Sequence, residues 1–206
     1  MGSSGVFLAL EGVDGAGKTT QIDRLVARLE SAGRSVVTVR EPGGTELGEV
    51  IRRILLERSD LGLGAEAELL LFLASRVQLY DEVIAPALAR GDVVVSDRYH
   101  LSTVVYQGIA RGLGEDRVVR ICEQVLDGRT PHRNVVLEIP FAESRERRRG
   151  EGNDRIEADE ALLKAVVDGF HTTAGLPGDS IVRVDGRGDV DTVAAQVWEG
   201  VSDVFS

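Results

Sequence analysis

Five short segments of almost continuous apolar residues are the clearest feature of the hydrophobic pattern of this chain. In the intervals between them, apolar residues recur three and four positions apart, which is the spacing of an amphipathic helix. Continuous apolar strands that alternate with helices are typical of a parallel sheet covered on both faces. The pattern therefore predicts an α/β fold. The predicted strands are 6–12, 35–40, 92–97, 134–139 and 180–184, and the predicted helices are 18–32, 46–57, 65–89, 101–109, 115–127, 141–149, 158–174 and 189–204.

The length and continuity of the chain bear on its domain organisation. It has 206 residues, which is enough for one domain with a well-formed core. No linker rich in proline, glycine or serine divides it, and no internal repeat is visible. We therefore expect a single domain over 1–206. The one compositional outlier is the arginine-rich stretch 143–155.

Composition narrows the classes of function. A net charge of −10 gives the protein no overall attraction to nucleic acid or to anionic membranes, so any bound anion needs a local cluster of positive charge. The single cysteine, Cys122, excludes an internal disulfide and a zinc site of several cysteines. The histidines His100, His132 and His171 are too scattered to indicate a metal site, and we expect them to be structural. Apolar runs are far shorter than a membrane span and the N-terminus lacks a basic signal region, so we expect a cytoplasmic protein.

Residues 12–19, GVDGAGKT, match the pattern G-x-x-x-x-G-K-[ST] between a predicted strand and a predicted helix. Glycines let successive backbone N–H groups surround a phosphate chain, and the start of the helix adds its positive dipole end. Lys18 can reach the β- and γ-phosphates of a nucleotide, and the Thr19 hydroxyl can bind Mg²⁺. The sequence therefore predicts an ATP-binding P-loop formed by Gly12, Val13, Asp14, Gly15, Ala16, Gly17, Lys18, Thr19 and Thr20.

Three classes of protein carry such a loop: kinases for a small acceptor, GTPase switches, and assembly or transport ATPases. A GTPase usually reads guanine with N-K-x-D, but the only lysines are Lys18 and Lys164, and neither lies in that motif. An ATPase of the third class normally has an apolar strand ending in Asp or Asp-Glu. Here the strand continues into DRYHLSTVVYQG (97–108), whose arginine, aromatic, hydroxyl and amide groups suit a small polar ligand better. The sequence favours a kinase.

Five motifs, in this order and spacing, resemble the thymidylate kinases: EGVDGAGKTTQ, REPGGT, FLASRVQ, DRYHLSTVVYQG and GNDRIE. The resemblance covers nearly the whole chain. It implies transfer of the γ-phosphoryl group of ATP to dTMP with Mg²⁺, which gives dTDP for dTTP synthesis. It also implies a P-loop kinase fold with a five-stranded parallel sheet flanked by helices on both faces, a short lid, and usually a homodimer. The nearest alternative is another deoxynucleoside or nucleoside monophosphate kinase, and an assembly ATPase is a more remote one.

Two pairs of residues, each spaced four apart, form the predicted base pocket. Phe72 and Arg76 share a helix face, where the ring can stack on a base and the guanidinium can donate to a thymine carbonyl oxygen. Without the resemblance, Phe72 would more often be a core residue and Arg76 a surface residue. Thr103 and Gln107 can present a hydroxyl and an amide to the base edge, and hydrogen bonds to O4 and N3–H would reject cytosine. By resemblance, Tyr106 crowds the sugar 2′ position, with a packing role as the alternative.

The sugar and phosphate of the acceptor need a different set of residues. A carboxylate close to phosphates is repelled, so Asp14 needs another role in the loop. The resemblance implies that it accepts a hydrogen bond from the sugar 3′-OH, and the alternative is a solvated loop acid. Arg98, at the carboxyl end of a predicted central strand, can hold the dTMP phosphate and the phosphoryl group in transfer. Asp97 beside it is the second predicted partner of Mg²⁺ after Thr19, and it contacts the ion either directly or through one of the ion's ligands.

The remaining acceptor residues follow from the resemblance. Arg52 matches a phosphate-contacting arginine of bacterial thymidylate kinases, and its neighbour Arg53 remains an alternative. Glu41 and Pro42 of REPGGT are expected to shape the acceptor side, where Glu41 could also organise water or metal. Ser102 belongs to the same predicted acceptor site.

The arginine-rich stretch is the predicted lid, over about 143–156. Such a run is usually a solvated helix end, but the glycines that follow it suggest a flap over the nucleotide. A supplied arginine is often worth about 10³–10⁵ in phosphoryl-transfer rate. The P-loop holds no arginine, so the arrangement resembles bacterial members that place this arginine in the lid. Arg149 and Arg155 are the leading catalytic candidates with Lys18 and Arg98, and Arg147 ranks behind them.

Overall fold

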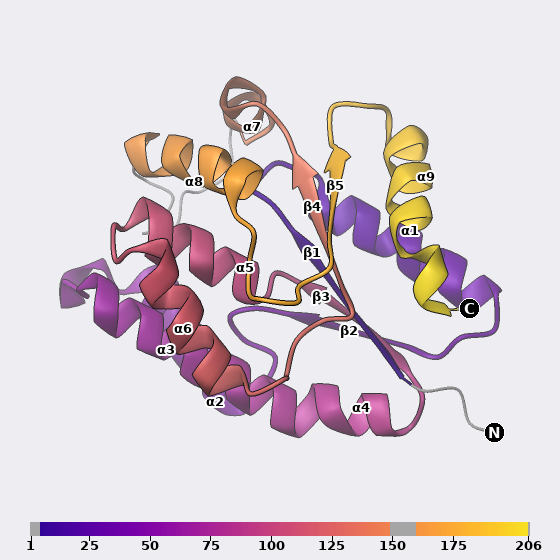
Figure 1. Cartoon of the computed structure of the whole chain (residues 1–206), viewed down its shortest axis with the longest axis horizontal. Helices are drawn as coiled ribbons and strands as arrows, with labels where there is room; N and C mark the ends of the chain where they lie inside the picture. The colour runs from indigo at the N-terminus through magenta and orange to yellow at the C-terminus, as the bar shows by residue number, and fades with distance from the viewer. Residues whose placement is uncertain (1–4, 149–159, 206) are drawn as a thin grey trace.

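Residues 5–148 and 160–205 are described by the computed structural model. Five strands form one sheet in the order β2-β3-β1-β4-β5, and all neighbouring strands run parallel (Figure 1). The predicted five-stranded parallel sheet is confirmed, and each strand lies within one residue of its expected bounds. The strands are β1 (Val6–Glu11), β2 (Val36–Arg40), β3 (Val93–Asp97), β4 (Arg133–Glu138) and β5 (Ile181–Asp185).

Helices connect the strands and cover both faces of the sheet (Figure 1). They lie close to the predicted ranges wherever the structure describes them. The helices are α1 (Lys18–Ser31), α2 (Glu46–Glu57), α3 (Ala65–Leu79), α4 (Ala85–Ala89), α5 (His100–Thr103), α6 (Glu115–Leu126), α7 (Phe141–Arg147), α8 (Glu160–Thr172) and α9 (Val190–Val201), with short 3-10 helices at Ser59–Leu61 and Ser202–Phe205.

Two predicted helices contain a π-helical segment that the spacing of apolar residues does not reveal. One segment, Tyr80–Ile84, joins α3 to α4 and ends two residues before Pro86. Proline has no N–H to donate and disturbs the ladder of the preceding turn, so a local change of helix type there has a physical cause. The other segment, Val104–Ala110, continues α5 and carries several predicted site residues.

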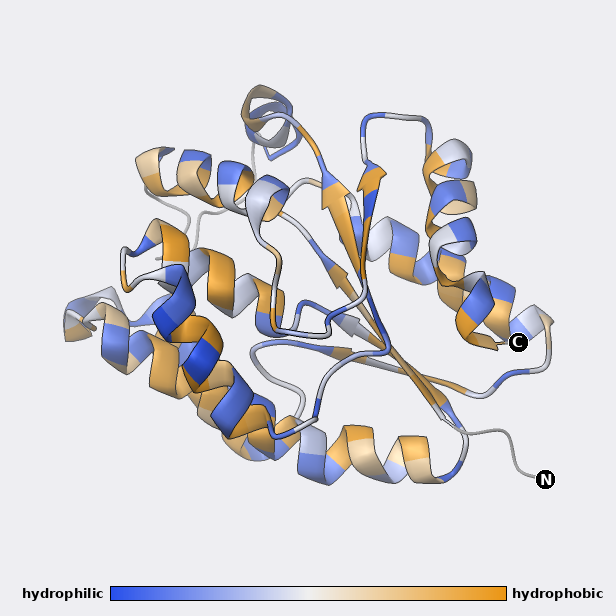
Figure 2. Ribbon diagram, viewed as in Figure 1, coloured by the Kyte–Doolittle hydropathy of each residue, from blue (hydrophilic) through white to orange (hydrophobic). Residues whose placement is uncertain are grey.

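The alternating side chains of the central strands build two hydrophobic cores, one on each face of the sheet. In β1, Leu8 and Leu10 belong to the core under α1 and α9, while Phe7 and Ala9 belong to the core under α3 and α6. Figure 2 shows strands that are hydrophobic along most of their length and helices that are hydrophobic along one side. A strand buried on both faces is apolar at most positions, which explains the nearly continuous apolar runs in the sequence.

Because the strands are parallel, the loops that follow their carboxyl ends gather at one edge of the sheet, where open α/β sheets bind ligands. Residues 12–17 follow β1, residues 41–45 follow β2, and Arg98 and Tyr99 follow β3. The second loop is fixed by Thr45, whose hydroxyl caps α2 by accepting a hydrogen bond from the N–H of Gly48 at 2.9 Å. The fold therefore brings together three of the motifs singled out in the sequence.

The three histidines lie in separate parts of the structure. His100 is buried against Asp179, with Nε2 and a carboxylate oxygen 2.7 Å apart, and His132 accepts from the Phe7 N–H at 2.9 Å. The exposed His171 lies beside Glu138. Within 5–148 and 160–205, no helix is long and apolar enough to cross a membrane.

Candidate active site

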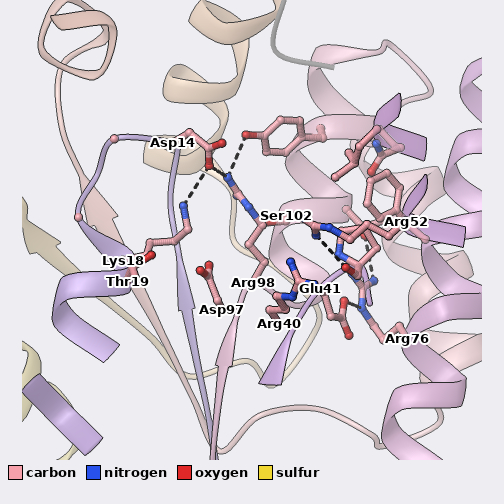
Figure 3. Close-up of a pocket in the computed structure, with 18 of the residues that line it drawn as sticks. Asp14, Lys18, Thr19, Arg40, Glu41, Arg52, Arg76, Asp97, Arg98 and Ser102 are labelled. Carbon is pink, nitrogen blue, oxygen red and sulfur yellow. Dashed lines mark hydrogen bonds and ion pairs between the residues drawn. The ribbon is translucent and has the colours of Figure 1, made fainter. Parts of the chain in front are cut away.

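A cavity of about 700 Å³ opens at the carboxyl edge of the sheet and brings most of the predicted site residues together. Figure 3 shows side chains from the P-loop, β3 and α3 turned toward it. Its lining includes the predicted residues Asp14, Gly15, Gly17, Lys18, Thr19, Thr20, Glu41, Pro42, Arg52, Phe72, Arg76, Asp97, Arg98, Ser102, Thr103, Tyr106 and Gln107. We call the part around the P-loop and Arg98 the phosphate end, and the part around Phe72, Arg76, Thr103 and Gln107 the base end.

The P-loop holds its lysine inside the loop. Gly15 and Gly17 have φ angles of 80° and 92°, which glycine adopts without the penalty that a Cβ brings. The ammonium of Lys18 lies 3.2 Å from the carbonyl oxygen of Gly12 and 3.3 Å from that of Val13. Burial lowers the pKa of Lys18, and the neighbouring Arg98 lowers it further. The site thus carries a compact cation among backbone dipoles, ready for a phosphate chain.

Three predicted P-loop residues support the loop without lining the cavity. Val13 and Ala16 are buried in the core beneath it. Gly12 lies against β4, so closely that a Cβ on it would lie 2.5 Å from the carbonyl oxygen of Leu137. The side chains of Val13 and Ala16 therefore stabilise the loop from behind, and the predicted contacts of these residues to a nucleotide would come from their backbone N–H groups.

Arg98 and Asp14 meet at the centre of the phosphate end (Figure 3). The Arg98 guanidinium donates to the carbonyl oxygen of Gly12 at 2.9 Å and to the hydroxyl of Ser102 at 3.1 Å, and it forms an ion pair with Asp14. Lys18 also contacts the Asp14 carboxylate, at 3.3 Å. One half-exposed acid thus contacts both cations, which explains in part why an acid is tolerated in a loop built for anions.

Glu11, at the end of β1, fixes the segment that carries Arg98. Its carboxylate is fully buried and accepts from the N–H of Tyr99 at 2.8 Å, from the N–H of Ser102 at 3.2 Å and from the Ser102 hydroxyl at 2.5 Å. Arg98 itself has a φ of 70°, a left-handed conformation that is uncommon for a residue with a Cβ. A charge-assisted network behind the loop stabilises this conformation. The sequence analysis missed Glu11, although an acid that ends an apolar strand was a visible signal.

The base end is built around a buried arginine. Arg76 is 1% exposed, and it donates from Nε to Glu41 at 2.6 Å, from Nη1 to the Thr103 hydroxyl at 2.9 Å and from Nη2 to the carbonyl oxygen of Tyr99 at 3.0 Å. The hypothesis of a surface Arg76 is wrong, because three partners from three segments replace its hydration. Burial raises the pKa of Glu41 to about 7, against the opposing effect of Arg76. Phe72 is half-buried beside these groups and packs on the core.

Gln107 is also held by a buried acid that the sequence analysis missed. Its side-chain Nε2 donates to Oε1 of Glu68 at 2.9 Å, and both residues are 1% exposed. Arg111 donates to the same carboxylate at 3.3 and 3.4 Å. Glu68 lies on α3, one turn before Phe72. An acid in the middle of an otherwise apolar helix face was the available signal.

Comparison with known proteins decides the family. The sequence model for thymidylate kinases matches residues 10–197. A thymidylate kinase of Deinococcus radiodurans is 40% identical over 203 residues, which cover 98% of each chain. One of Thermosipho africanus is 39% identical over 192 residues (93% of this chain and 95% of that protein), and one of a Synechococcus species is 45% identical over 174 residues (81% and 83%).

The chain belongs to the thymidylate kinase family.

Membership of the thymidylate kinase family makes the remaining residues of the cavity easier to place. Arg52 lines the cavity and donates to the carbonyl oxygen of Pro42 at 2.8 Å, whereas Arg53 is exposed and is absent from the lining. Arg40 and Leu56 also line the cavity and were not among the predicted site residues, and Arg147, the third-ranked lid candidate, lines it as well. Arg40 was the first residue of the REPGGT motif, so its position was available in the sequence.

The described part of the predicted lid is α7, and it is attached to the P-loop. The Ser144 hydroxyl donates to the carbonyl oxygen of Asp14 at 2.8 Å. Arg147 donates to the carbonyl oxygens of Gly15 at 3.3 Å and Gly186 at 3.0 Å. Arg145 instead pairs with Glu160 on α8 at 2.6 Å. The leading candidates Arg149 and Arg155 lie outside the described residues.

Thymidylate kinases resemble other ATP-dependent kinases in needing Mg²⁺, and the oxygen groups of the phosphate end fit this ion. Thr19 lines the cavity beside Lys18, and Asp97 lines it from the end of β3. One carboxylate oxygen of Asp97, Oδ1, is buried and has no hydrogen-bond partner within the described part of the chain. Within the same residues, no cluster of three or more His, Cys, Asp or Glu side chains could hold a metal. Mg²⁺ is commonly held by one or two protein oxygens together with substrate phosphates. The Thr19 hydroxyl and the Asp97 carboxylate are oxygen donors of this kind.

Proposed function

We propose that this chain transfers the γ-phosphoryl group of ATP to dTMP, giving dTDP and ADP, as a step in dTTP synthesis. The main support for the proposal is that one cavity combines groups suited to phosphates with groups suited to a base. The phosphate end presents Lys18 and Arg98, and the base end presents a ring and buried hydrogen-bonding groups. A nucleoside monophosphate has the same two parts. The relatives described above are named thymidylate kinases, which supports this acceptor.

The reaction needs positioning and charge neutralisation more than covalent chemistry. An oxygen of the dTMP phosphate attacks the γ-phosphorus of ATP, the bond between that phosphorus and the β–γ bridging oxygen breaks, and ADP leaves. The attacking oxygen is already anionic, so no strong general base is required. Lys18 stabilises the β- and γ-phosphates, and Arg98 stabilises the acceptor phosphate and the group in transfer. Thr19 and Asp97 would hold Mg²⁺, which would supply further neutralisation of the phosphate charge.

The acceptor is oriented by the rest of the lining. Phe72 stacks on the thymine ring, Arg76 donates to its O4, and Thr103 and Gln107 read the rest of the edge. Asp14 accepts from the sugar 3′-OH, and Tyr106 crowds the 2′ position. The remaining contacts to the acceptor come from Glu41, Pro42, Arg52 and Ser102.

The lid arginine, the oligomer and the compartment complete the proposal. Arg149 and Arg155 supply positive charge to the transferring group, with Arg147 as the next candidate. The chain forms a homodimer. Support comes from the exposed large hydrophobic side chains in 5–148 and 160–205, since three of the five, Leu47, Val50 and Leu70, lie on α2 and α3. The enzyme works in the cytoplasm, as a single domain over 1–206.

A coupled assay of ADP release tests the proposal. ATP and Mg²⁺ are supplied with dTMP, dUMP, dCMP, dGMP, UMP or thymidine. We expect strong turnover with dTMP, weaker turnover with dUMP and almost none with the others. Preferred turnover of another monophosphate would replace dTMP as the substrate and keep a P-loop kinase. Without turnover of any acceptor, an assembly ATPase would become the better hypothesis.

A further inference from the structure

Glu68 and Gln107 form a buried pair between two helices that are distant in the sequence. Glu68 lies on α3 and Gln107 on the π-helical segment Val104–Ala110, 39 positions away. Both side chains are 1% exposed, and the contact is 2.9 Å long. Burying a charged group costs free energy that even a good partner often does not fully offset. The pair therefore calls for a functional explanation.

The chemistry of the pair fixes the direction of the Gln107 amide. An amide group has an acceptor on one side and two donors on the other, and a free glutamine side chain can turn either side toward a ligand. An ionised carboxylate only accepts hydrogen bonds. Glu68 therefore holds the NH₂ group of Gln107, and the carbonyl oxygen of the amide is left for the other side.

Arg111 is a second partner of Glu68. It donates to both carboxylate oxygens, at 3.3 and 3.4 Å, and so supplies the opposite charge that a buried carboxylate needs. The backbone ties Arg111 to the segment that carries Gln107, because the Arg111 N–H donates to the carbonyl oxygen of Tyr106 at 2.8 Å. The carboxylate and the amide are thus fixed on a common frame.

The fixed amide lies in the base end of the cavity. Gln107 lines the cavity with Thr103, whose hydroxyl oxygen already accepts from Arg76 at 2.9 Å. Thymine and uracil present N3–H, a donor, between two carbonyl oxygens. Cytosine presents N3 as an acceptor beside a donating amino group. An acceptor fixed in the wall fits the first pattern and leaves unpaired polar groups against the second.

We propose that Glu68 is a positioning residue that sets the base preference, by holding the Gln107 amide with its carbonyl oxygen toward the N3–H of a thymine or uracil base. The proposal rests on the proposed function, since it assumes that a pyrimidine nucleotide occupies the base end. Glu68 does not touch the base and acts only through Gln107. Without Glu68, the amide can reverse and meet cytosine as well as thymine.

The test compares dTMP with 5-methyl-dCMP, which has the same size and differs only along the base edge. Glu68→Gln keeps the shape of the side chain and removes the charge that orients Gln107. We expect the ratio of kcat/KM for dTMP over that for 5-methyl-dCMP to fall at least tenfold, chiefly through KM. The matched control is Glu66→Gln, on the same helix, where the side chain is 62% exposed and pairs with Arg117 at 3.4 Å. Its ratio should remain that of the unaltered protein.

A double variant separates positioning from a general structural effect. In a Gln107→Ala background the amide is gone, so Glu68→Gln should produce no further change in the ratio. An unchanged ratio in a folded Glu68→Gln protein would overturn the proposal, and so would an equal fall of the ratio in both backgrounds. If Glu68→Gln does not fold, Gln107→Ala decides alone, and a ratio within twofold of the unaltered protein overturns the proposal. Absence of dTMP turnover in the unaltered protein would instead remove the proposed function itself.

Discussion

The phosphate end and the base end of the cavity differ in how their charged groups are held. At the phosphate end, Lys18 and Arg98 contact backbone carbonyl oxygens and share Asp14, whose side chain is 38% exposed. At the base end, Arg76 and Glu41 are 1% and 2% exposed and contact one another directly. One end holds its cations by contacts that are partly open to solvent, and the other holds its arginine in a closed network.

This difference corresponds to what each end must bind. A phosphate is strongly charged, so it can replace the carboxylate and carbonyl partners of Lys18 and Arg98 and gain charge-assisted hydrogen bonds. A pyrimidine base is neutral and offers only a few hydrogen bonds, which give selectivity only if the protein groups already point the right way. We therefore expect the phosphate end to rearrange on binding and the base end to remain as it is.

The largest expected effect comes from removing the central cation of the phosphate end. Arg98→Ala should lower kcat/KM for dTMP by about 10³-fold, with kcat reduced and dTMP binding weakened together, because the guanidinium acts on both the acceptor and the group in transfer. Steady-state kinetics with varied dTMP measures both quantities. Arg90→Ala, an exposed arginine paired with Asp92 before β3, is the control and should leave both unchanged. Near-normal turnover in Arg98→Ala would refute the role given to Arg98.

The closed network of the base end should instead appear in stability. Burial raises the pKa of Glu41 from 4.5 to about 7, so the folded state binds this proton more tightly than the unfolded state. The contribution of this carboxyl to stability is therefore full below pH 4.5 and is lost as the pH rises through 7. Glu41→Gln should flatten the fall in unfolding free energy over this interval, by about 3 kcal/mol at most. Urea unfolding at pH 4.5, 6 and 7.5 measures the change.

A carboxyl on the surface provides the comparison for Glu41. Glu49 contacts Arg40 at the mouth of the same loop, and its side chain is 39% exposed. Glu49→Gln should leave the slope between pH 4.5 and 7 as it is in the unaltered protein. If Glu41→Gln and the unaltered protein show the same slope, Glu41 is ionised in the folded state across this range and the account of its burial is wrong.

A smaller effect distinguishes two neighbouring arginines. Arg52→Ala should raise KM for dTMP by about tenfold, the value of one charge-assisted hydrogen bond, because Arg52 lines the cavity. Arg53→Ala removes the same charge from an exposed position one residue away and should have no effect. Parallel KM measurements on the two variants decide between them, and a rise in KM for Arg53→Ala alone would reverse the assignment.

The two ends also differ in how much of them the sequence predicts. The P-loop and the residues that follow β3 are contiguous motifs, and a short stretch of chain carries both the residues and their spacing. The strands were equally visible, because a strand buried on both faces leaves an uninterrupted apolar run. The predicted fold and the phosphate end therefore agree with the structure to within a few residues.

The base end depends on contacts between distant segments, and these were not predicted. Glu41 and Arg76 are 35 positions apart, and Glu68 and Gln107 are 39 apart. One pair behind Arg98 at the phosphate end is of the same kind, since Glu11 and Ser102 are 91 apart. Such pairs form only when helices pack in one particular rotation, and neither spacing nor composition specifies that rotation. Each pair contains a buried acid, and nothing beside that acid in the sequence identifies its distant partner. The π-helical segment that carries Gln107 also changes which residues share a face, and periodicity alone gives no sign of it.

The most direct test of this account is a crystal structure of the protein with dTMP bound. The account predicts that the Arg98 guanidinium leaves Asp14 and contacts the dTMP phosphate, while Arg76 stays within about 0.3 Å of its 2.6 Å distance to Glu41 and Gln107 keeps its contact to Glu68. The thymine ring should lie between Phe72 and the network of Arg76. An Arg98 that stays on Asp14 with dTMP bound, or a base seated away from Arg76 and Gln107, would contradict it.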